Sequence, residues 1–133
     1  MSMFQSPKFL RYVLLADSAS CVATGAVQVM LTGVLADAMR LPAPLLMGTG
    51  VFLVAYAAFA VLIATRDPVP RAFVWLFVAG NFGWAAACIA LLAASPLHPS
   101  MLGQGWVIAQ AVTVVVLAEL QWGGLRARPA GWA

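Results

Sequence analysis

The stretch AFVWLFVAGNFGWAAACIALLAASPLHPSMLGQGWVIAQAVTVVVLA, residues 72–118, contains no Asp, Glu, Lys or Arg. Its one break is the segment 95–100, in which Pro96 and Pro99 flank His98. A membrane-spanning helix needs about 20 consecutive apolar residues. The stretch therefore has the length and composition of two spans joined by a tight turn, and it predicts an all-α membrane protein.

The composition of the whole chain agrees with this class. Of its 133 residues, 64% are hydrophobic and 8% are charged, whereas about a quarter of the residues of a soluble domain are charged. The basic excess, 7 Lys and Arg against 4 Asp and Glu, lies at the ends of the apolar segments. We therefore expect the lipid bilayer as partner, and no nucleic acid.

Proline-containing breaks divide the chain into four predicted spans within a single membrane domain, residues 1–133. The spans are expected at about 9–32, 44–65, 71–94 and 101–125, and the first is too long for the apolar core of a cleaved signal. Residues 34–41 are expected to form a short helix in the membrane interface, because Asp37 and Arg40 share one face. Short connections between the spans predict an up-down four-helix bundle.

The basic residues predict the orientation. Lys8, Arg11, Arg66, Arg71, Arg126 and Arg128 all fall on one side of the predicted spans, and only Arg40 falls on the other. Because Lys and Arg accumulate in cytoplasmic loops, we expect both termini to be cytoplasmic. The predicted location is a bacterial inner membrane.

Asp17 heads the most functional-looking pattern in the chain. Together with Ser20, Cys21, Thr24 and Gln28, it falls within about 100° of arc on one helical face. Charged side chains inside a membrane are costly and often mark solute or proton pathways. Polar side chains also hold membrane helices together by hydrogen bonds, and the sequence leaves both interpretations open.

Glu119 is the second acidic residue within a predicted span, at a depth similar to that of Asp17. It is a candidate proton-binding group, or alternatively a carboxylate that pairs with a cytoplasmic Arg or reaches the interface. Gln110 lies on the opposite face of the same helix, together with Thr113 and Gln121. Two polar faces on one span suggest that one of them meets another subunit, either in a homo-oligomer or in a complex with a membrane protein partner.

Asn81 and Trp84 belong to a stripe on the third predicted span, with Phe77 and Cys88. Gln28, Asn81 and Gln110 all fall at central depth, where an amide without partners is expensive. We expect the three to converge in a polar core, either as structural contacts or as the lining of a solute site.

Motifs for enzyme chemistry are missing from the sequence. No nucleophile and base can be paired, no metal-ligand spacing occurs, and Cys21 and Cys88 form no CxxC pair. We therefore expect no catalytic residues, no metal and no cofactor.

Four short segments resemble a group of small bacterial four-span integral membrane proteins of unknown function. They are Leu15-Ala16-Asp17, Leu41-Pro42-Ala43, Gly80-Asn81-Phe82-Gly83-Trp84 and Ala118-Glu119-Leu120-Gln121. The resemblance implies four spans and brings no activity with it. Two functions stay open: binding or transport of a small lipophilic or ionic solute through a polar bundle interior, and a non-catalytic accessory or structural subunit of a membrane complex.

Overall fold

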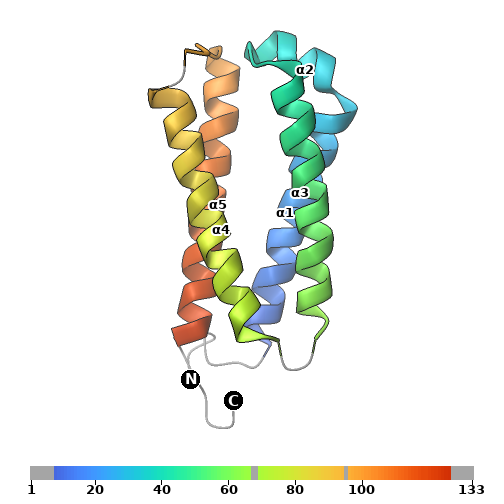
Figure 1. Ribbon diagram of the computed structural model, residues 1–133, viewed down its shortest axis with the longest axis vertical. Helices are drawn as coiled ribbons and strands as arrows, with labels where there is room; N and C mark the ends of the chain where they lie inside the picture. Colours follow the sequence, from blue (N-terminus) through green and yellow to red (C-terminus); the bar gives the residue numbers. More distant parts are fainter. Residues whose placement is uncertain (1–7, 67–68, 95, 127–133) are drawn as a thin grey trace.

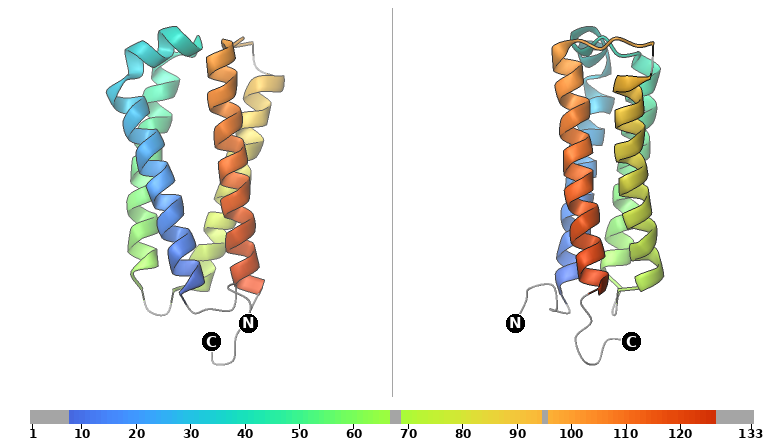
Figure 2. Two further views of the ribbon diagram at one scale, coloured as in Figure 1. Left: turned by 180° about the vertical axis from the view of Figure 1, so that it is seen from behind. Right: turned by 90° about the vertical axis from the view of Figure 1, so that its left-hand side faces the viewer.

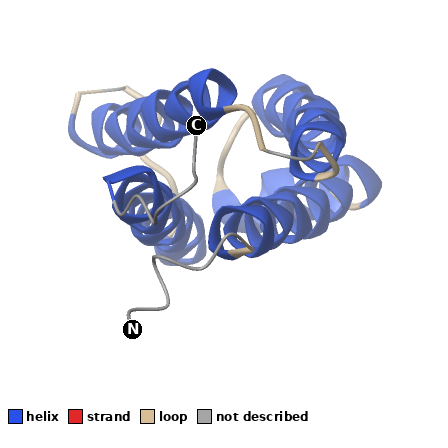
Figure 3. Ribbon diagram, turned by 90° about the horizontal axis from the view of Figure 1, so that it is seen from below, coloured by secondary structure: helices blue, strands red, loops and turns tan. Residues whose placement is uncertain are grey.

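The computed structural model describes residues 8–66, 69–94 and 96–126, and this part of the chain contains helices and no strand (Figure 3). The helices are α1 (Phe9–Met30), α2 (Thr32–Met39), α3 (Ala43–Ala64), α4 (Arg71–Ala93) and α5 (Met101–Arg126). All but the short α2 are long and apolar enough to cross a membrane. The prediction of four long apolar helices is confirmed.

The four long helices are arranged as two pairs (Figure 1). α1 packs mainly against α3, and α4 packs mainly against α5. The pairs approach each other most closely through α1 and α5, while α2 lies across one end of the bundle (Figure 2). The first residue of α1 and the last residue of α5 lie at the opposite end of the bundle from α2.

Two glycines allow the close approach of α1 and α3. A Cβ atom added to Gly25 would lie 2.7 Å from the carbonyl oxygen of Gly50, and one added to Gly50 would lie 3.0 Å from the carbonyl oxygen of Gly25. Small residues at a crossing let helix backbones meet, as is common in membrane helices.

The break between α1 and α2 falls at Leu31, slightly before the end of the first predicted span. α2 ends at Met39, and the next residue, Arg40, adopts the left-handed conformation with φ 55°. The segment before α5 is attached to this end of α2, because the Ser100 backbone N–H donates to the Met39 carbonyl at 2.9 Å and the Ser100 hydroxyl to that of Ala38 at 2.7 Å. The two helix pairs are thus connected at the α2 end.

Apolar side chains fill both ends of the bundle. The core at the end of the bundle opposite α2 joins all four long helices and includes Leu14, Ala60, Phe77 and Leu125. A second core, around Met39, Leu46, Cys88 and Val107, lies at the α2 end. The polar side chains of the interior lie between these two cores.

Candidate functional site

Asp17 is fully buried and belongs to a hydrogen-bonded network that links three helices. Its Oδ2 atom accepts hydrogen bonds from Asn81 Nδ2 of α4 at 2.9 Å and from Gln121 Nε2 of α5 at 2.8 Å. Asn81 also donates to Gln121 Oε1 at 3.1 Å, and Cys21 Sγ donates to Asp17 Oδ1 at 3.5 Å. We call these four residues the Asp17 network. It ties α1 of one pair to both helices of the other pair.

Gln28 is the centre of a second network, closer to α2. Its Nε2 donates to Thr49 Oγ1 at 2.8 Å and to the Leu46 carbonyl at 3.0 Å. Its Oε1 accepts from Trp106 Nε1 at 2.9 Å and, more weakly, from Gln110 Nε2 at 3.4 Å. Trp84 Nε1 completes this Gln28 network by donating to Gln110 Oε1 at 3.1 Å. The Gln28 network therefore includes side chains of α1, α3, α4 and α5.

The spacing of the polar residues explains why two networks form. Asp17 and Gln28 lie 11 residues apart on α1, and Gln110 and Gln121 lie 11 residues apart on α5. Eleven residues are about three helical turns, so each pair shares one helical face and is separated by about 16 Å along the axis. Because the two helices run in opposite directions (Figure 1), Asp17 meets Gln121 and Gln28 meets Gln110.

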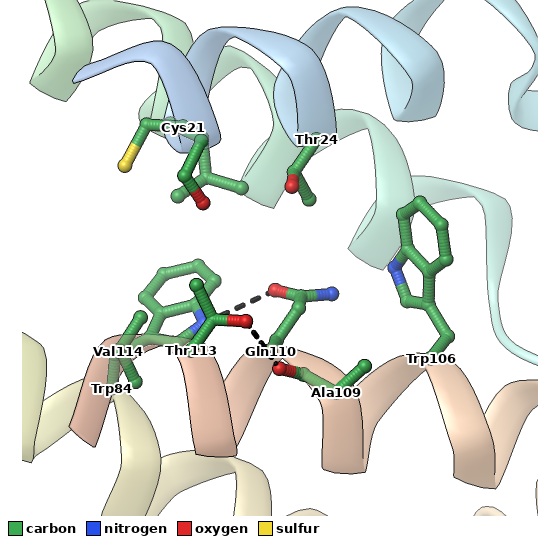
Figure 4. Close-up of a pocket in the computed structure, with 10 residues that line it drawn as sticks. Cys21, Thr24, Trp84, Trp106, Ala109, Gln110, Thr113 and Val114 are labelled. Carbon is green, nitrogen blue, oxygen red and sulfur yellow. Dashed lines mark hydrogen bonds between the residues drawn. The ribbon is translucent and has the colours of Figure 1, made fainter. Parts of the chain in front are cut away.

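A cavity of about 120 Å³ lies between α1 and the pair α4–α5. Figure 4 shows Cys21 and Thr24 of α1 facing Gln110 and Thr113 of α5 across it. We call it the first cavity; its lining residues are Ser20, Cys21, Thr24, Leu53, Trp84, Trp106, Ala109, Gln110, Thr113 and Val114. None of these side chains is charged, and Ala109 and Thr113 are exposed on the outside of the bundle.

A second cavity, of about 160 Å³, lies nearer to α2. It shares Trp84, Trp106 and Gln110 with the first cavity. Its other walls include four leucine side chains of α3, α4 and the α2–α3 connection, together with Gln28, Thr49, Ala87, Cys88 and Val107. The Gln28 network therefore lies between the two cavities, and its side chains form part of the walls of both. A rotation of the Gln110 side chain would change the space available in each.

The structure divides the predicted site residues into three groups. Asp17 and Asn81 meet in the Asp17 network, whereas Gln28, Gln110 and Trp84 meet in the Gln28 network. The expectation that Asn81 converges with Gln28 and Gln110 is wrong, because Asn81 lies on the turn of α4 that faces Asp17. Glu119 belongs to neither network: its side chain is exposed on the outer face of α5.

The two networks also contain residues that were not among the predicted site residues, and Gln121 and Trp106 are the largest of them. Gln121 is fully buried against Asp17, and Trp106 donates to Gln28. The repeat of Gln110 and Gln121 at the spacing of Asp17 and Gln28 is the signal that could have identified Gln121. Trp106 carries no comparable signal, since a tryptophan near the end of a span has the position typical of an interfacial residue.

The site combines hydrogen-bonded polar side chains with apolar walls. Within the described residues, no three His, Cys, Asp or Glu side chains come together to hold a metal ion. The Asp17 carboxylate already accepts three hydrogen bonds. The Tyr56 hydroxyl is buried without a hydrogen-bond partner in the described part of the chain.

The fold is compatible with an integral membrane protein: four of its helices are candidate spans, and two polar networks lie in its interior. The chain matches no protein-family model, no curated protein and no solved structure.

Proposed function

We propose that this protein is a multi-pass inner-membrane protein that binds a small lipophilic solute between its two helix pairs. The first cavity carries the proposal, with Trp84, Trp106 and Gln110 as the main contacts. In this arrangement the long helices cross the membrane as an up-down bundle, both termini are cytoplasmic, and α2 lies in the opposite interface. The distribution of Lys and Arg supports this orientation.

The size of the first cavity supports a ligand of a few heavy atoms. Its volume of about 120 Å³ is close to that of an engineered cavity of about 150 Å³ that binds benzene in another protein. Two indole rings and the Leu53 side chain supply apolar surface, and Gln110 supplies a polar group. Apolar walls with a few convergent polar groups are typical of small-molecule sites.

The chemistry of the lining favours a neutral solute over an ion. The side chains around the first cavity carry no charge, and the nearest acidic group, Asp17, is held by donors from Cys21, Asn81 and Gln121. An ion would lose its hydration without gaining a counter-charge there, which is costly at membrane depth. Ala109 and Thr113 line the first cavity and are also exposed on the outside of the bundle. Their exposure supports a route by which the solute enters the cavity from the hydrocarbon region of the bilayer.

Phenol is a suitable probe, because its ring matches the cavity in size and its hydroxyl can hydrogen-bond Gln110. We expect ligand-observed NMR to detect phenol bound to the protein in nanodiscs, above the signal of empty nanodiscs. Thr24→Leu should remove this signal by filling the cavity. Ala23→Leu, on the exposed side of α1, should retain it. Equal signals from the native protein, Thr24→Leu and empty nanodiscs would refute the proposal.

A role as a non-catalytic subunit of a membrane complex is the second candidate function. The three donors to Asp17, two on Oδ2 and one on Oδ1, favour this function, because that network is a structural connection between helices. Native-like stability and absence of probe binding in the same nanodisc experiment would favour this second function.

A further inference from the structure

The second cavity adjoins the solute site, and the proposed function does not use it. Its volume is about 160 Å³, against about 120 Å³ for the first cavity. Trp84, Trp106 and Gln110 line both cavities, so a molecule that fills the first cavity touches side chains that also form walls of the second. A solute longer than the first cavity would therefore reach the second.

The walls of the second cavity favour an apolar group. Leu41, Leu46 and Val107 line it and are buried, and Leu45 and Leu91 line it and are partly exposed. Cavities with aliphatic walls stay dry and bind apolar molecules. A charged or strongly polar group would lose its hydration against these side chains without compensation.

The polar side chains of the second cavity are already hydrogen-bonded to one another. Gln28 Nε2 donates to Thr49 Oγ1 at 2.8 Å and to the Leu46 carbonyl at 3.0 Å. Thr49 Oγ1 donates to the Leu45 carbonyl at 2.7 Å, and Gln28 Oε1 accepts from Trp106 Nε1 at 2.9 Å. A polar occupant would compete with these hydrogen bonds, whereas an apolar occupant leaves them intact.

Gln110 lines both cavities and has hydrogen-bonding capacity left for a solute. Its Oε1 accepts from Trp84 Nε1 at 3.1 Å. Its amide nitrogen carries two N–H donors, and among the described residues it makes one contact, of 3.4 Å, to Gln28 Oε1. That distance is long for a hydrogen bond of this type, which is usually about 2.9–3.0 Å. The Gln110 amide can therefore bind the polar end of a solute where the two cavities adjoin.

We propose that the second cavity binds the alkyl chain of the solute whose polar ring lies in the first cavity. The inference rests on the proposed function and narrows the solute to a neutral molecule with a polar aromatic ring and a short alkyl chain. A cavity of about 150 Å³ holds the six carbons of benzene, so about 160 Å³ suits a chain of about four to six carbons. The long contact between Gln110 and Gln28 would open as the chain enters.

Photolabelling of the protein in nanodiscs locates the chain. The probe is a phenol with a short 4-alkyl chain that ends in a diazirine, and mass spectrometry should find the label on Leu45 or Leu91. Ala87→Trp should remove this labelling but retain phenol binding by NMR, because Ala87 lines only the second cavity and is exposed at its edge. Ala86→Trp is the matched control: Ala86 is also exposed on α4, lines neither cavity, and should keep both signals.

Competition separates the chain of a ring-bound solute from a lipid-like chain that binds by itself. Saturating phenol should suppress the labelling of Leu45 and Leu91, because phenol and the ring of the probe share the first cavity. Labelling that resists saturating phenol, persists in Ala87→Trp or spreads evenly over the outer surface would overturn the inference, even where phenol itself binds. Absence of phenol binding to the native protein would instead refute the proposed function, and this inference with it.

Discussion

Asp17 Oδ2 accepts a hydrogen bond of 2.8 Å from Gln121 Nε2, across the boundary between the two helix pairs. Asn81 joins the same two side chains, so the three form a closed set of polar contacts in an apolar bundle. Polar contacts between membrane helices fix which faces meet, because apolar faces pack almost equally well against lipid. We conclude that this contact holds the pairs in register, and that the cavities follow from the register.

Replacing Asn81 by Leu should lower the free energy of unfolding by about 1–3 kcal/mol, since a buried carboxylate and a buried amide each lose a partner. Titration with SDS, followed by circular dichroism, measures this. Phe82→Leu is the control, because the neighbouring Phe82 is 37% exposed and makes no polar contact among the described residues. A loss for Asn81→Leu no larger than that for Phe82→Leu would mean that the Asp17 network does not stabilise the fold.

Replacing Gly50 by Ala should destabilise the α1–α3 pair by about 1–3 kcal/mol, the usual cost of overpacking. Its new Cβ would lie 2.9–3.0 Å from Val29, Gln28 and the Gly25 carbonyl oxygen. Gly48→Ala, on the same helix with nothing within 4 Å of the new Cβ, should be neutral or stabilising because Ala favours helix more than Gly does. Thermal unfolding in detergent compares the two, and equal melting temperatures would be inconsistent with the close crossing.

The hydrogen bond from Trp106 to Gln28 should appear as a coupling free energy in a double-mutant cycle of Gln28→Leu and Trp106→Phe. Such bonds in a membrane protein average about 0.6 kcal/mol and reach about 1.7 kcal/mol. We expect a value in the upper half of this range, because Gln28 is buried and makes four contacts. Additive effects of the two substitutions would show that the 2.9 Å contact contributes nothing.

The sequence predicts the four long helices because length and charge-free composition are properties of each segment alone. It also shows the Asp17–Gln28 stripe, since that pattern lies on one helix. It does not show that Asn81 hydrogen-bonds to Asp17, or that Glu119 is exposed on the outer surface of the bundle. In a membrane protein both the core-facing and the lipid-facing sides are apolar, so hydrophobic periodicity does not separate inside from outside. Those assignments depend on which helices pair.

The position of α2 shows the same dependence. Asp37 and Arg40 on one face predict a short helix after the first span, and α2 covers Thr32–Met39. Its attachment to Ser100 joins segments that are far apart in the sequence. No local pattern around Ser100 indicates that contact.

The central claim, that the first cavity binds a small lipophilic solute, is tested most directly by diffraction from crystals soaked with 4-bromophenol. Bromine gives an anomalous signal, so its position can be located without interpreting weak ligand density. We expect a bromine peak bounded by Thr24, Trp84 and Gln110 in the native protein, and none at that position in Thr24→Leu. Bromine found only in the surrounding lipid, with the first cavity empty at saturating concentration, would contradict the claim.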